Sequence, residues 1–97
     1  MYCVAIDLWA KAGREAEVAA LFQEYVPIVE AMPGTIRFKV HRDVADPSHF
    51  LLYALYDSRE ALLAHRGDEL FKVWRPRIAA LELRRHLVEY NTVVGQP

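Results

Sequence analysis

Two segments of this 97-residue chain suit only β-strands that are covered on both faces. Tyr2–Ala10 splits into two alternating rows that are both mostly apolar: Val4, Ile6 and Leu8 in one, and Cys3, Ala5, Asp7 and Trp9 in the other. Phe50–Tyr56 is apolar at nearly every position. A strand with one face in water carries polar residues at every second position. These segments therefore predict two central strands of a sheet that lies between two layers.

A helix is predicted between the first two strands. Residues 14–31 carry apolar side chains at helical spacing, and Gly13 precedes them. Pro33-Gly34 ends this helix. Pro27 removes one helical hydrogen bond, so we expect a kink or an early end at that point.

The middle of the chain predicts a hairpin. Residues 35–42 alternate as a strand that is polar on one face, which is typical of a position near the sheet edge. Residues 43–49 contain Asp46-Pro47-Ser48 and predict a turn. Phe50–Tyr56 then returns as the third strand.

Two helices and a last strand follow. Asp57 and Glu60 have the spacing of a capping box and predict a helix over residues 58–66. Gly67 breaks that helix, and Asp68 can cap a second one with an apolar stripe. Residues 82–92 predict a long fourth strand.

The predicted order is β-α-β-β-α-β, an α+β ferredoxin-like pattern in a single domain over residues 1–97. We expect sheet order 4-1-3-2, with strands one and three adjacent and parallel in an otherwise antiparallel sheet. Both helical segments then cover one face. The other face is predicted to pack against a second copy as a homodimeric α/β barrel, through Val4, Ile6, Leu8, Leu51, Tyr53 and Leu55.

Charge and composition exclude several classes of partner. The net charge of −1 gives no electrostatic footprint for nucleic acid. No run approaches the roughly 18 apolar residues of a membrane span, and no signal peptide is visible. The single cysteine, Cys3, suits a reducing compartment, so we expect a cytoplasmic protein without a disulfide.

One apolar pocket is predicted between the sheet and the helices. The small side chains of Ala5 and Ala54 leave space there, and His65 lies on a helix above them. His65 is a candidate acid or base, Asp7 can orient it or raise its pKa, and Tyr56 can donate a hydrogen bond. The candidate catalytic residues are thus His65, Asp7 and Tyr56, and the candidate substrate-binding residues are Ala5, Leu52, Ala54, Phe71 and Trp74.

Structural roles compete with each of these assignments. A single His on a short helix is often a capped core residue, and Phe71 and Trp74 suit plain packing. Asp7 can be a strand-end charge in solvent. No metal-ligand spacing, phosphate loop or dinucleotide fingerprint is present, so no metal or cofactor is predicted.

Several short motifs follow one another along the chain: Gly13, Pro33-Gly34, Arg42-Asp43, Asp46-Pro47, Phe50–Tyr53, Asp57-Ser58, Ala61, Ala64-His65, Phe71 and Trp74. Their order resembles the antibiotic-biosynthesis-monooxygenase family from Val4 to about Leu81. The resemblance implies a homodimer that oxidises a small aromatic or quinol-like molecule with dioxygen and without metal or flavin.

The chain departs from the family at three polar positions. The family often carries Glu where Ala54 and Met32 stand, and His where Leu70 stands. These departures favour a non-catalytic small-ligand-binding or stress-response module on the same fold. A His65-dependent isomerase or lyase is a further alternative.

Overall fold

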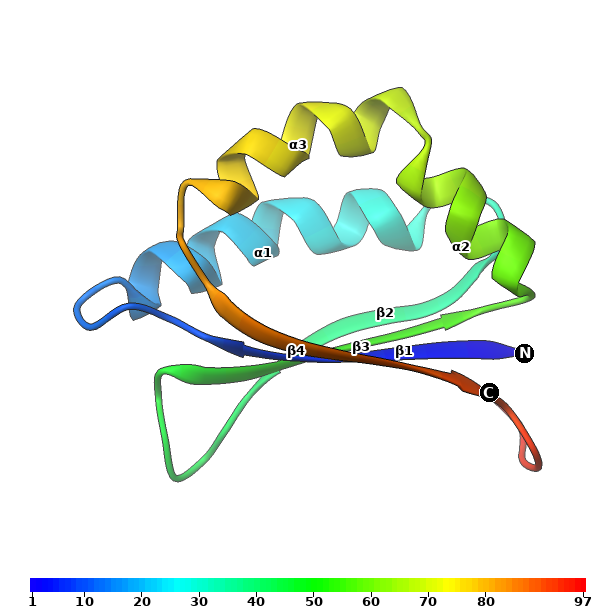
Figure 1. The fold of residues 1–97 in the computed structure, drawn as a ribbon, viewed down its shortest axis with the longest axis horizontal. Helices are drawn as coiled ribbons and strands as arrows, with labels where there is room; N and C mark the ends of the chain where they lie inside the picture. The colour runs from blue at the N-terminus through cyan, green and yellow to red at the C-terminus, as the bar shows by residue number, and fades with distance from the viewer.

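The computed structural model describes residues 1–97 as a four-stranded sheet with three helices (Figure 1). The chain order confirms the predicted α+β ferredoxin-like pattern, with the second helical segment divided in two. No helix is both long and apolar enough to cross a bilayer. The elements are β1 (Tyr2–Trp9), α1 (Glu15–Glu30), β2 (Thr35–Arg42), β3 (His49–Tyr56), α2 (Arg59–Arg66), α3 (Glu69–Ala79) and β4 (Arg84–Asn91).

The sheet order is β2-β3-β1-β4, which confirms the predicted order 4-1-3-2 read from the other edge. The prediction that strands one and three run parallel is wrong, because β1 and β3 pair antiparallel. The α1 crossover returns the chain so that β2 runs in the direction of β1. The β2–β3 hairpin then reverses it once more. Every neighbouring pair in the sheet is therefore antiparallel.

All three helices lie on one side of the sheet (Figure 1). We call this side the covered face and the other side the open face. The early end that is one of the two outcomes predicted for Pro27 does not occur, since α1 continues through Pro27 to Glu30. Pro27 lies in the last part of α1 with its ring exposed, so only one helical hydrogen bond is lost there.

The predicted faces of β1 are inverted in the structure. Val4 pairs with Ala54, Ile6 with Leu52 and Leu8 with Phe50, and paired residues of antiparallel strands point to the same side. Val4, Ile6 and Leu8 are therefore on the covered face, not in the predicted dimer surface. The open face of the two central strands carries Cys3, Ala5, Asp7, Trp9, His49, Leu51, Tyr53 and Leu55.

Two caps fix the helices that follow the hairpin. Ser58, not Asp57 with Glu60, caps α2, and its Oγ accepts a hydrogen bond from the Ala61 amide at 3.2 Å. Asp68 caps α3 as predicted and accepts from the Leu70 amide at 2.8 Å. The caps fix where α2 and α3 begin, and α2 buries its one histidine, His65.

Candidate functional site

His65 is buried against aromatic and thioether side chains from four other elements or their ends. Only 7% of the residue is exposed. Its Nε2 lies 3.5 Å from the Tyr25 hydroxyl, and its Nδ1 lies 3.1 Å from the Met32 sulfur. The nearest rings belong to Phe71, Tyr56 and Phe38, at centroid distances of 5.2, 6.2 and 6.3 Å.

The surroundings of His65 favour its neutral form. Burial lowers the pKa of His65, Asp68 raises it and Arg66 lowers it further. Burial also raises the pKa of Tyr56 to about 12 and that of Tyr25 well above its ordinary value. The two phenols therefore stay protonated at neutral pH. The imidazole of His65 is the group in this cluster that can accept a proton there.

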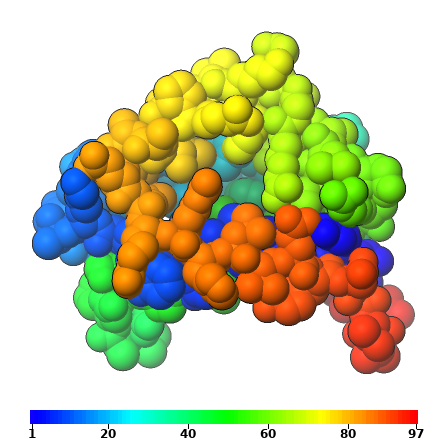
Figure 2. Space-filling view, viewed as in Figure 1, coloured from blue at the N-terminus to red at the C-terminus, as the bar shows by residue number.

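A hollow lies near this cluster on the β4 side of the molecule. Figure 2 shows it between α3 and β4. Leu87 of β4 pairs with Ile6 on the covered face, yet it is 39% exposed, because α3 does not extend over this edge. Trp74 of α3 is buried, and Phe71 is half-buried against the core. The covered face thus offers an apolar surface that is open to solvent along one edge.

A carboxylate of β4 lies on the covered face and contacts α2. Glu89 of β4 pairs with Val4 and so lies on the covered face. It accepts a hydrogen bond from the Tyr2 hydroxyl at 2.5 Å, and Arg66 Nη2 lies 3.5 Å from its other oxygen. The Tyr2 hydrogen bond and the Arg66 charge lower the pKa of Glu89, so it is a carboxylate at neutral pH.

The sequence analysis did not select Glu89, Tyr2, Tyr25 or Met32 as site residues. Tyr25 lies within the helix predicted over residues 14–31 and Met32 directly follows it, and the structure places both beside His65. Glu89 lies two residues after Leu87, in the same row of β4. The alternation in β4 shows that Glu89 and Leu87 share a face of the sheet. To know that this is the covered face requires the pairing of β4 with β1.

The structure brings most of the predicted pocket residues together. Leu52, Ala54 and Tyr56 lie in one row of the covered face and are buried. Phe71 and Tyr56 lie next to His65, and Trp74 packs on Tyr25 with ring centroids 5.1 Å apart. Ala5 does not belong to this group, because it lies on the open face.

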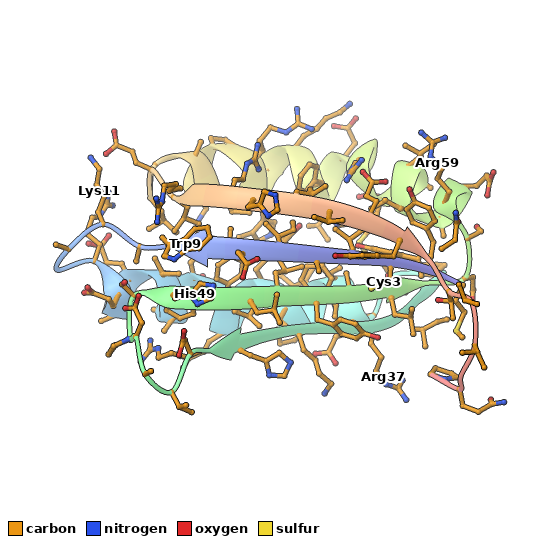
Figure 3. All side chains as sticks on the ribbon, turned by 60° about the horizontal axis from the view of Figure 1, so that its bottom comes forward. Cys3, Trp9, Lys11, Arg37, His49 and Arg59 are labelled. Atoms are coloured by element: carbon orange, nitrogen blue, oxygen red, sulfur yellow. The ribbon has the colours of Figure 1, made fainter.

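Asp7 also lies on the open face and does not contact His65. Its Oδ1 lies 2.8 Å from His49 Nε2, and Asp43 Oδ2 lies 2.9 Å from His49 Nδ1. The Trp9 ring stacks on His49 with centroids 4.9 Å apart, and Figure 3 shows the two rings together. The predicted contact of Asp7 with His65 is therefore wrong, since the pairing of Asp7 with Leu51 places its carboxylate on the open face, away from the helices.

The two carboxylates set the proton state of His49. Hydrogen bonds to Asp43 and then to Asp7 raise the pKa of His49, which favours the imidazolium. The pKa of Asp43 is lowered, first by the hydrogen bond with His49. No group of three or more His, Cys, Asp or Glu residues has an arrangement that could hold a metal ion.

The antiparallel sheet with its helices on one face, and the aromatic cluster around His65, define an α+β protein of the dimeric-barrel fold. The chain belongs to the antibiotic biosynthesis monooxygenase family, whose model matches residues 1–77. No curated protein matches the chain in sequence.

Solved structures share this fold at low sequence identity. A Deinococcus radiodurans protein assigned to the family has TM-score 0.89 and 18% identity, covering 100% of this chain and 97% of its own. A Nitrosomonas europaea protein has TM-score 0.88 and 23% identity, with coverages of 97% and 100%. A mutant of SnoaB, a cofactor-independent oxygenase from Streptomyces nogalater, has TM-score 0.82 and 14% identity, with coverages of 99% and 97%.

Proposed function

We propose that this chain is a cofactor-independent monooxygenase that acts on a small aromatic or quinol-like molecule. The observation that carries the proposal is a neutral histidine held among aromatic side chains beside an apolar hollow. Membership of the monooxygenase family supports the reaction class. The cofactor-independent oxygenase among the structures with this fold is consistent with it.

In the proposed reaction the substrate itself supplies the electrons. His65 takes a proton from an acidic hydroxyl or C–H group of the bound ring, and the resulting anion reduces dioxygen. One oxygen atom enters the substrate as a carbonyl and the other leaves as water. An apolar site favours this chemistry, because exclusion of water strengthens the contact between base and substrate.

Access to His65 depends on Phe71. The Phe71 ring is half-buried and lies 5.2 Å from the imidazole, on the helix that borders the hollow. We propose that the substrate ring takes the place of Phe71 when this side chain turns outward. Trp74, Leu52 and Ala54 then contribute to the apolar walls, and Tyr56 serves as a hydrogen-bond donor.

Oxygen uptake with a panel of quinols and anthrones tests the function. With an anthrone, we expect one dioxygen consumed for each quinone formed, above the rate of the buffer alone. The electrode trace and the quinone absorbance must agree in stoichiometry. Binding of panel members without enzyme-dependent oxygen uptake would contradict the proposal.

A ligand-binding module without catalysis is the second candidate. One observation favours it: His65 already has Tyr25 and Met32 as partners and is almost fully buried. In that role the histidine shapes the core and no proton moves. The oxygen-uptake panel separates the two candidates directly.

We also propose that the protein acts as a homodimer in the cytosol and that the open face forms the interface. This face exposes Leu51, with Tyr53, Val88 and Ala5 partly exposed beside it. Several hundred Å² of such apolar burial contributes on the order of 10 kcal/mol before the costs of association. Val4, Ile6 and Leu8 do not contribute to it, because they lie under the helices.

A further inference from the structure

A groove runs along the edge of the sheet opposite to the hollow. It lies between α1 and β2, whereas the hollow borders β4, and these two strands are the two edges of the sheet. Its volume is about 480 Å³, and its apolar walls include Phe22, Val26 and Val40. Sites for small organic molecules have volumes of about 300–1,000 Å³. The groove is thus large enough for a ligand of one or two aromatic rings.

Arg42 provides one fixed positive charge in this groove. Its guanidinium carbon lies 4.9 Å from the centroid of the Phe50 ring, which also lines the groove. The ring holds the cation by a cation–π contact but does not neutralise it. Arg42 takes part in none of the salt bridges of the chain. The Arg42 guanidinium can therefore pair with an anionic ligand whose apolar part packs on the wall of the groove.

A second groove of similar size differs from the α1–β2 groove, because its arginines are paired with carboxylates of the chain. It lies between α1 and α3, has a volume of about 400 Å³ and contains two arginines. Arg14 pairs with Glu17 at 3.0 Å, and Arg77 pairs with Glu24 at 2.7 Å. Its cations already have carboxylate partners within the chain. An anionic ligand gains little there, because it competes with those carboxylates.

Pro27 adds a hydrogen-bond acceptor to the α1–β2 groove. Proline has no amide hydrogen, so the carbonyl of Gln23, four residues earlier, lacks its usual helical donor. Helix carbonyls point toward the following turn, and both Gln23 and Pro27 line the groove. The Gln23 carbonyl is the acceptor that this groove would offer to a hydroxyl group of a ligand.

We propose that the α1–β2 groove is a second small-molecule site that binds a hydroxylated aromatic carboxylate. The carboxylate pairs with Arg42, the ring packs between Val26 and Val40, and the hydroxyl donates to the Gln23 carbonyl. This site is separate from the His65 cluster, and its occupation requires no turnover.

Amide NMR titrations of the whole chain test the proposal with three probes: 2-naphthoate, its neutral analogue 2-naphthylmethanol, and 6-hydroxy-2-naphthoate. We expect 2-naphthoate to shift the amides of Val26, Val40 and Arg42 and to bind more tightly than the alcohol. The hydroxylated acid should bind more tightly still. Shifts confined to Leu87 and Trp74, or equal affinity for the acid and the alcohol, would overturn the proposal.

Two variants sharpen the test. Arg42→Gln should lower the affinity for 2-naphthoate about fivefold to tenfold and leave the affinity for 2-naphthylmethanol unchanged. Arg37→Gln is the matched control, because Arg37 lies on the same strand but on the open face. Equal losses in both variants would contradict the site, and so would no loss in Arg42→Gln. A third outcome is that an extended peptide shifts the amide signals of all of β2 while the naphthoates shift none. That result would overturn the proposal and identify the β2 edge as a binding surface for a protein partner.

Discussion

His65, which α2 packs onto the covered face of the sheet, and His49, which lies on the open face, favour opposite proton states. On the covered face, burial lowers the pKa of His65 and leaves it neutral among aromatic rings. On the open face, Asp43 and Asp7 raise the pKa of His49 and favour the imidazolium. The side-chain chemistry is identical, so the difference comes only from the neighbours. A neutral imidazole can serve as a base, whereas an imidazolium between two carboxylates holds strands and loop together.

The largest expected effect is on turnover. His65→Ala should lower the turnover number by roughly 10²- to 10⁴-fold, because the proposed general base is lost, with little change in ligand affinity. His49→Ala is the matched control on the open face and should keep the wild-type rate. Oxygen uptake on the folded fraction measures both. A His65→Ala protein that turns over at the wild-type rate would remove the catalytic role and support the binding module.

The second effect concerns assembly through the open face. Leu51→Lys should raise the dissociation constant of the dimer by about 100-fold or more, since it places an unpaired charge in the interface. Leu63→Lys is the control: Leu63 is 44% exposed, similar to Leu51 at 36%, but lies on α2. Sedimentation velocity over a concentration series measures the change. A wild-type protein that sediments as a folded monomer at micromolar concentration would contradict the dimer itself.

The third effect tests how α2 is seated on the covered face. Gly34 has φ +83°, and a Cβ there would lie 2.7 Å from Ala61 Cβ. Gly13 has the same φ with nothing within 4 Å. Gly34→Ala and Gly13→Ala share the backbone strain, so their difference isolates the clash. We expect Gly34→Ala to lose about 1–3 kcal/mol more in urea unfolding. Equal losses would show that α2 moves away freely.

A smaller effect is expected from the C-terminal tail. β4 ends at Asn91, and Val93 and Val94 beyond it are 94% and 88% exposed. We predict that this segment adds to a strand edge of the partner subunit. A chain that ends at Asn91 should raise the dissociation constant of the dimer about tenfold, measured by sedimentation. An unchanged constant would limit the interface to the open face.

The smallest effect is the pH dependence of stability, and it differs in sign between the two histidines. The pKa of His65 in the folded protein lies below the unfolded value of about 6.5. The contribution of His65 to folding stability is therefore present above about pH 6.5 and is lost as the pH falls below that value. The pKa of His49 in the folded protein lies above its unfolded value. The contribution of His49 to folding stability is therefore lost as the pH rises through the folded pKa. Urea midpoints should flatten on the acid side in His65→Phe and on the alkaline side in His49→Gln. The reverse assignment would refute the comparison.

The sequence alone predicted the order of elements and the neighbours in the sheet. Period-two and helical patterns show where apolar side chains must be buried, and few sheet topologies satisfy β-α-β-β-α-β. The Asp68 cap was predictable because its hydrogen bond lies within one turn. Ser58 was missed in favour of the Asp57 and Glu60 pattern, since two capping residues stood side by side.

The faces of β1 and the contents of the site were decided only by the tertiary structure. Both rows of β1 are mostly apolar, so the pattern does not show which row faces the helices. The pairing of Val4 with Ala54 decides it, and a shift of one residue would exchange the two faces. His65 likewise meets Tyr25 and Met32 only after α1 and α2 are placed on the sheet. A pKa depends on such neighbours, and these come from distant parts of the chain.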